Sequence, residues 1–158
     1  MRNRVYAVID TTVLVSALIA KDNDSYPLKV LGYAYSGKIV PLFNDEILEE
    51  YQEVLKRGKF NLSAEDIFQA ISTLARLGES VTRISIHEEL FPDESDRKFY
   101  EVMMSRENAF LITGNGKHYP HRQNVVTPRE MVEILNGLYK VVTLDEIDEE
   151  IRLSREGK

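Results

Sequence analysis

Short apolar runs alternate along this chain with longer segments in which apolar residues recur at helical spacing. Five runs are typical of strands in a mainly parallel sheet: residues 5–9, 38–43, 80–86, 109–113 and 125–126. Helical spacing or helix-start signals mark the other segments: residues 12–20, 26–36, 44–57, 63–77, 93–106 and the stretch after 127. This alternation predicts an α/β domain with a sheet between layers of helices.

Polar residues that favour the first position of a helix support these boundaries. Asn44 and Ser63 stand where two helices are expected to begin, and either Asp93 or Ser95 opens a later one. The strongest signal is residues 127–130 (TPRE), in which threonine and glutamate can cap each other and proline occupies the first helical position.

The length and composition are those of one ordinary domain. The chain has 158 residues, of which 43% are hydrophobic and 29% charged, a balance typical of globular proteins. We expect the domain to span residues 1–140. A charged helical extension over 141–158 would pack on it or on a second copy in a homodimer.

Composition also excludes several classes of site and location. The absence of cysteine excludes disulfides, thiolate metal sites and cysteine nucleophiles, and favours a cytoplasmic protein. The longest apolar stretch, residues 13–20, is far shorter than the roughly 20 residues that cross a bilayer, so no membrane span is expected. The basic residues 1–4 lead into a strand-like run, which predicts a first strand and not a signal peptide.

The net charge of −6 argues against a protein that holds nucleic acid or anionic membrane by bulk attraction. It leaves open an enzyme that acts on nucleic acid through a metal ion in an acidic pocket. The position of the negative charges therefore matters more than their sum.

Oxygen-bearing side chains follow three of the predicted strands. Asp10 follows the first strand, Asp93 and Asp96 come after the third, and Thr113 and Asn115 lie at the end of the fourth. Ligands of open α/β sheets bind at the carboxyl ends of the strands, and hard oxygen ligands suit Mg²⁺ or Mn²⁺.

Each of these acids has a simpler structural interpretation. Asp10 and Asp93 could serve only as helix caps. Glu50 lies at the margin of the apolar stripe of its helix, where a boundary glutamate usually keeps its carboxylate in water.

The residues around these acids resemble the motifs of PIN-domain proteins. The resemblance is carried by residues 8–18 (VIDTTVLVSAL), 48–55 (LEEYQEVL), 93–99 (DESDRKF), 111–115 (LITGN) and 126–130 (VTPRE). These motifs occur in the family's order and extend over residues 5 to about 137. The branch that the chain resembles is that of VapC-like ribonuclease toxins of bacterial toxin–antitoxin systems.

The resemblance implies a three-layer α/β/α sandwich and Mg²⁺- or Mn²⁺-dependent cleavage of RNA, with a cognate antitoxin protein as partner. It implies roles for seven residues: Asp10, Glu50 and Asp96 as metal-binding catalytic acids, Asp93 as a fourth acid, Asn115 as a metal ligand, and Thr11 and Thr113 as supporting groups.

The chain departs from the family's usual pattern at two positions, because Thr12 replaces an asparagine and Asn115 replaces an aspartate. The second change favours an alternative interpretation, a catalytically impaired PIN-like module that binds nucleic acid or protein. Leu111 occupies the place of the first glycine of a phosphate-binding loop, and Thr12 that of the second aspartate of a haloacid-dehalogenase-like phosphatase. A phosphate-binding loop is rejected, also because His118 and not Ser or Thr follows Lys117, and a haloacid-dehalogenase-like phosphatase fits poorly and would be tested with small phosphate esters.

A basic run follows the fourth motif. Residues 117–122 (KHYPHR) include Lys117, His118 and Arg122, which are candidates for RNA contacts. In the same run, Tyr119 either stacks on a base or packs onto the core.

Overall fold

Five parallel strands form one sheet in the order β3–β2–β1–β4–β5. The computed structural model describes residues 4–137. Its strands are β1 (Val5–Ile9), β2 (Ile39–Phe43), β3 (Glu79–Ser80), β4 (Phe110–Ile112) and β5 (Val125–Val126). The helices are α1 (Thr11–Leu18), α2 (Tyr26–Tyr35), α3 (Asp45–Leu55), α4 (Ala64–Leu77) and α5 (Arg97–Met104), with short turns η1 (Gly58–Phe60), η2 (Glu94–Asp96) and η3 (Gly116–His118). A further helix begins at residue 128 and is described to residue 137.

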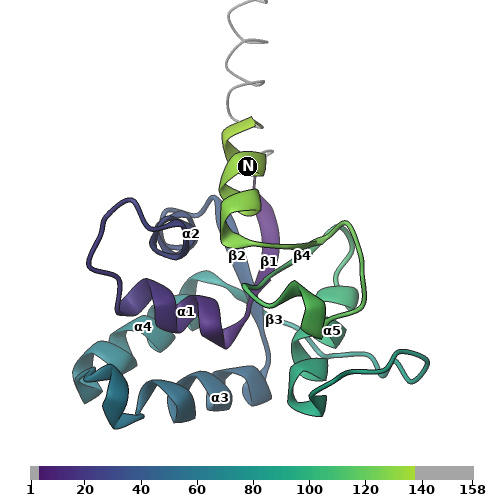
Figure 1. Ribbon diagram of the computed structural model, residues 1–158, viewed down its shortest axis with the longest axis horizontal. Helices are drawn as coiled ribbons and strands as arrows, with labels where there is room; N and C mark the ends of the chain where they lie inside the picture. Colours follow the sequence, from purple (N-terminus) through teal and green to yellow (C-terminus); the bar gives the residue numbers. More distant parts are fainter. Residues whose placement is uncertain (1–3, 138–158) are drawn as a thin grey trace, which may run out of the picture.

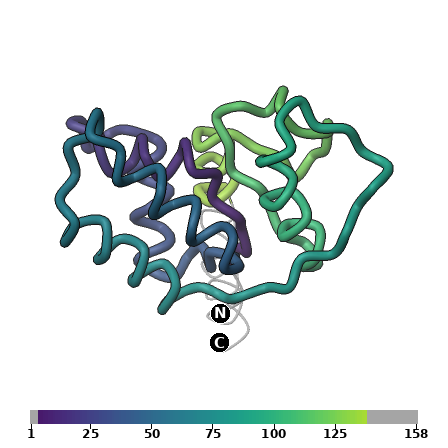
Figure 2. Tube along the Cα trace, turned by 90° about the horizontal axis from the view of Figure 1, so that it is seen from below, coloured from purple at the N-terminus to yellow at the C-terminus, as the bar shows by residue number. Residues whose placement is uncertain are grey.

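Helices cover both faces of the sheet, which confirms the predicted α/β/α sandwich (Figure 1). Figure 2 shows α1–α4 on one side of β1 and the segment from α5 to β5 on the other. Because β1 lies between β2 and β4, the residue that follows β1 is next to the carboxyl ends of two other strands.

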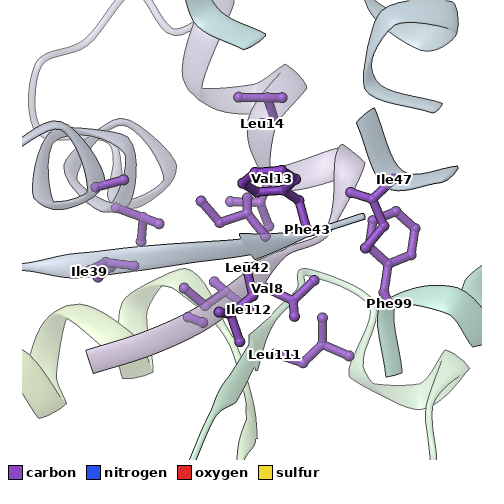
Figure 3. Packing of buried hydrophobic residues seen from close by; sticks show 14 of the residues in the cluster. Val8, Val13, Leu14, Ile39, Leu42, Phe43, Ile47, Phe99, Leu111 and Ile112 are labelled. Atoms are coloured by element: carbon purple, nitrogen blue, oxygen red, sulfur yellow. The ribbon is translucent and has the colours of Figure 1, made fainter. Parts of the chain in front are cut away.

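The core is built from the strands and the inner faces of the helices. Every residue of β2 is buried, and Val8, Leu42 and Leu111 are fully inaccessible to solvent. Figure 3 shows their side chains together with Ile47 of α3 and Phe99 of α5. This packing fixes α3 and α5 against the central strands, and these helices carry the remaining candidate acids.

The predicted helix starts are confirmed by hydrogen bonds. Asn44 accepts a hydrogen bond from the backbone of Ile47 at 2.9 Å, and Ser63 accepts one from that of Asp66 at 3.0 Å. Thr127 and Glu130 cap each other, with the threonine hydroxyl 3.1 Å from the amide of Glu130 and the glutamate carboxylate 2.8 Å from the amide of Thr127.

The prediction of a third strand over residues 80–86 is wrong in extent, because the strand comprises only Glu79–Ser80. Side chains in α5 and directly after it accept hydrogen bonds from the backbone donors that a strand would use. Ser105 accepts from the amide of Ile84 at 2.8 Å, and Glu101 accepts from that of Ile86 at 2.8 Å. Residues 81–92 instead cross from the α4 side of the molecule to the α5 side (Figure 2).

Gly78 ends α4 where the helix meets the sheet. A Cβ atom at this position would lie 2.1 Å from the carbonyl oxygen of Pro41 in β2 and 2.8 Å from that of Leu74. Real Cβ atoms do not approach backbone oxygens so closely, so the contact between α4 and β2 requires glycine.

The predicted charged extension over residues 141–158 lies outside the described residues. Within residues 4–137, no helix has both the length and the apolar character needed to cross a bilayer.

Candidate active site

Asp10 lies at the centre of the site, directly after β1, with only 5% of its surface exposed. Its Oδ2 accepts hydrogen bonds from the Thr113 hydroxyl at 2.7 Å and from the Tyr119 hydroxyl at 3.2 Å. Its Oδ1 accepts from the backbone of Thr12 at 3.3 Å, which starts α1. Asp10 is therefore a helix cap and a site residue at once, so the two interpretations of its position were not exclusive.

The groups around Asp10 shift its pKa in opposite directions. Burial raises the pKa of this carboxyl above its ordinary 3.8, the Glu50 charge adds to the rise, and the hydrogen bonds from Thr113, Thr12 and Tyr119 oppose it. The three hydrogen bonds thus favour the ionised form of a carboxyl group whose burial disfavours that form.

Glu50 points from α3 toward α1 and α5, and its side chain is 24% exposed. The Thr11 hydroxyl donates a hydrogen bond to one carboxylate oxygen. The other, Oε1, lies 2.6 Å from Nζ of Lys98. The carboxylate of Glu50 therefore lies inside the site. The family motif implied this position, whereas helical spacing alone favoured a carboxylate in water.

Asp93 and Asp96 approach the site from the loop before α5. Asp93 opens η2 by accepting hydrogen bonds from the amide and hydroxyl of Ser95 at 2.9 and 2.7 Å. These bonds lower the pKa of Asp93. Asp93, and not Ser95, is thus the cap.

Asp96 is the acid whose charge is most strongly disfavoured. Its side chain is 18% exposed, and its Oδ2 lies 3.5 Å from Nδ1 of His118. Burial, followed by the charges of Asp10 and Asp93, raises the pKa of Asp96 to about 6. This shift shows that acids from separate segments of the chain share one electrostatic environment.

A cavity of about 920 Å³ lies between α1, α3 and the start of α5. Its walls include six residues of the site: Asp10, Thr11, Glu50, Asp93, Asp96 and Lys98. Thr113 is fully buried beneath it and contacts the site through Asp10. Asn115 does not line the cavity. Its backbone amide donates to Thr113 at 3.0 Å.

The residues of the basic run 117–122 have different surroundings and do not form one basic surface. Lys117 is exposed, whereas His118 lies beside Asp96. Arg122 donates a hydrogen bond to the Tyr100 hydroxyl and lies 3.8 Å from Glu89. The Tyr119 ring is 6% exposed and packs edge-on against Phe91, so of its two interpretations packing onto the core holds.

The donor chemistry fits a hard divalent cation, because the cavity gathers carboxylates whose mutual repulsion such an ion would relieve. Over residues 4–137, however, no group of three acidic or histidine side chains is arranged to hold an ion as it stands. Glu50 does not complete such a group, because its carboxylate is already bound by Lys98 and Thr11.

The sequence did not predict the roles of three residues in the site. Tyr119 and Lys98 contact Asp10 and Glu50, and the Tyr51 hydroxyl donates to the carbonyl oxygen of Ile9 at 2.5 Å, which ties α3 to the end of β1. Lys98 and Tyr51 each lie within two residues of a candidate acid, which was the only signal in the sequence.

A family model described as PIN domain matches residues 6–117. The match covers more than half of the chain, so the protein belongs to the PIN-domain family. PIN domains are typically nucleases and generally use divalent metal ions. A search of curated proteins found no match.

Replacing Tyr119 with phenylalanine is expected to lower the free energy of unfolding by about 1–2 kcal/mol, because a buried carboxylate loses a hydrogen bond. Any nuclease activity should fall about tenfold, since the hydroxyl orients Asp10. Thermal unfolding and initial rates measure the two effects. Tyr33→Phe is the matched control, because its hydroxyl donates to Asn136 at an exposed position. Equal behaviour of the two variants would show that the Tyr119 hydroxyl does not support the site.

The metal-free protein is expected to lose stability as the pH rises from about 4 to 6. Asp96 has a pKa of about 6 when folded, against an ordinary value of 3.8, so the folded state binds a proton in this window that the unfolded chain has released. The Asp96 contribution is fully present below the window and lost above it. The difference between the two pKa values corresponds to about 3 kcal/mol, which partial exposure of the side chain to solvent reduces to roughly 2 kcal/mol.

Thermal unfolding in chelator across this pH range measures the effect. Asp96→Asn should flatten the dependence, whereas Asp66→Asn, at an exposed position outside the cavity, should not. Parallel pH profiles for wild type and Asp96→Asn would contradict the assignment.

Proposed function

We propose that this PIN-domain protein is an endoribonuclease that depends on Mg²⁺ or Mn²⁺, with Asp10, Glu50 and Asp96 as its core acids and Asp93 beside them. The observation that carries the proposal is the meeting of Asp10 and Asp96 at one cavity, where the charge of Asp10 helps to raise the pKa of Asp96. A hydrolytic site for phosphodiesters needs such acids at an accessible edge of the sheet.

A divalent cation bound to these acids would lower the pKa of a water molecule and offset negative charge on the phosphate. The protein's own residues supply the rest. Thr113 and Tyr119 keep Asp10 oriented toward the cavity through their hydrogen bonds. Asp96 lines the cavity, and its pKa is raised to about 6 in the metal-free protein, so we assign to it the uptake of a proton from an attacking water.

The test is incubation of the purified protein with a fluorescent single-stranded RNA in Mn²⁺ or Mg²⁺, with samples in chelator and with single-stranded DNA of the same sequence. Cleavage of the RNA that needs the metal supports the proposal. Intact RNA under every condition, or cleavage that continues in chelator, refutes it.

A catalytically impaired binding module is the second candidate function. The engagement of both Glu50 oxygens by Lys98 and Thr11 favours it, as does the uncharged Asn115. Calorimetric titration with Mn²⁺ separates the candidates. A working site should bind the ion and lose it on Asp10→Asn, whereas an impaired fold should show no difference between the two proteins.

We also propose that the protein acts in the cytoplasm as the toxin of a toxin–antitoxin pair, inhibited by a cognate antitoxin. Expression in a bacterial host should then arrest growth, and expression of Asp96→Asn should not. Lys117 and His118 are the proposed RNA contacts, because His118 lies 3.5 Å from Asp96 and Lys117 is its exposed neighbour in the chain. Arg122 has a weaker case, because Tyr100 and Glu89 already engage its guanidinium group.

A further inference from the structure

Lys98 places its ammonium group inside the acidic cavity, at the start of α5. It is the second residue of α5, and its side chain is only 12% exposed. Its Nζ lies 2.6 Å from Oε1 of Glu50 and donates a hydrogen bond to the carbonyl oxygen of Ser95. A lysine so little exposed requires partners of this kind, because an unpaired charge is costly to bury.

The neighbours of Lys98 hold the ion pair in place. The Thr11 hydroxyl donates a hydrogen bond to the second oxygen of Glu50. Residues of α1 and α5 therefore each bind one oxygen of this carboxylate. The ammonium group also lies 5.1 Å from the centre of the Phe99 ring. Its charge contributes to the lowered pKa of Asp93. One cation therefore favours the charged form of two carboxylates in the cavity, Glu50 and Asp93.

We propose that Lys98 is a positioning residue that acts as the counter-ion of Glu50 in the metal-free protein and competes with a divalent cation for that carboxylate. The inference rests on the proposed function, in which Glu50 belongs to the metal site. A doubly charged ion repels a nearby ammonium group, so Glu50 has to exchange Lys98 for the metal. Lys98 stabilises the empty site and, for the same reason, weakens its affinity for the ion.

The first experiment measures Mn²⁺ affinity by calorimetry on the full chain. Lys98→Met should bind Mn²⁺ about tenfold more tightly than wild type, because a competing positive charge is removed. Lys98→Gln keeps a side chain that can donate hydrogen bonds but has no charge, and it should show the same gain. Lys29→Met, at an exposed position of α2 that does not line the cavity, is the matched control and should leave the affinity unchanged.

Unchanged or weaker affinity in both Lys98 variants overturns the competition. If Lys98→Met does not fold, Lys98→Gln decides the result alone. Failure of wild type and both variants to bind Mn²⁺ overturns this inference and the ribonuclease proposal together.

The second experiment is a double-mutant cycle on the thermal stability of the metal-free protein. Lys98→Met should lower Tm by roughly 3–6 °C in the wild-type background. It should have little effect in a Glu50→Gln background, where the paired charge is already gone. An equal drop in both backgrounds overturns the counter-ion role.

The two proposals can fail separately, because neither experiment uses RNA. A protein that shows the expected gain in affinity and the expected coupling, yet leaves RNA intact, refutes the ribonuclease and leaves the role of Lys98 standing. A protein that cleaves RNA, with the Lys98 variants binding Mn²⁺ as wild type does, refutes only the role of Lys98.

Discussion

Replacing Asp96 with asparagine is expected to reduce RNA cleavage by about a hundredfold or more, the range typical for loss of a general base. The substitution removes one of the charges that would hold the metal and the group placed to take up a proton. The fold should survive, because the pKa of about 6 shows that the metal-free protein already disfavours a charge at this position.

Initial rates on a single-stranded RNA with saturating Mn²⁺ measure the effect. Asp66→Asn is the matched control, because Asp66 is exposed in the first turn of α4 and does not line the cavity. An Asp96→Asn variant as active as this control would remove Asp96 from the site.

Replacing Gly78 with alanine is expected to lower the free energy of unfolding by about 3 kcal/mol, because the new methyl group would overlap the carbonyl oxygen of Pro41. Pro41 lies in the buried strand β2, so the backbone has little freedom to move away. For a chain of this length the loss corresponds to a Tm lower by roughly 10 °C.

Gly58→Ala supplies the comparison, because a Cβ atom at Gly58 would meet no atom within 4 Å. Its Tm should change by no more than about 2 °C. If the two variants melt together, α4 can shift relative to β2 without cost, and the close contact has no energetic weight.

Elements defined by local signals could be predicted from the sequence. The apolar run at β1 and the caps at Asn44, Ser63 and Thr127 depend on neighbouring residues, and the structure confirms them. The third strand could not be bounded in this way. Its backbone donors are taken by Ser105 and Glu101, which are distant in sequence and contact it only after α5 has packed.

In the site, too, the sequence indicated some residues but not the contacts between distant elements. Asp10 follows from its position after a predicted strand. Asp96 was placed after a third strand that ends already at Ser80, and Glu50 was identified by the family motif and not by its helical spacing. The partners that hold these acids were not predictable. Tyr119 and Lys98 act through contacts between separate elements, which one sequence does not display.

The order of the strands determines when the protein can become active during its synthesis. The central strand β1 is made first, yet Asp10 obtains its partners Thr113 and Tyr119 only after β4 has paired beside β1. A chain still on the ribosome without these residues has an incomplete site. On the proposed function, an emerging chain therefore cannot cut RNA until Thr113 and Tyr119 have joined the fold beside Asp10.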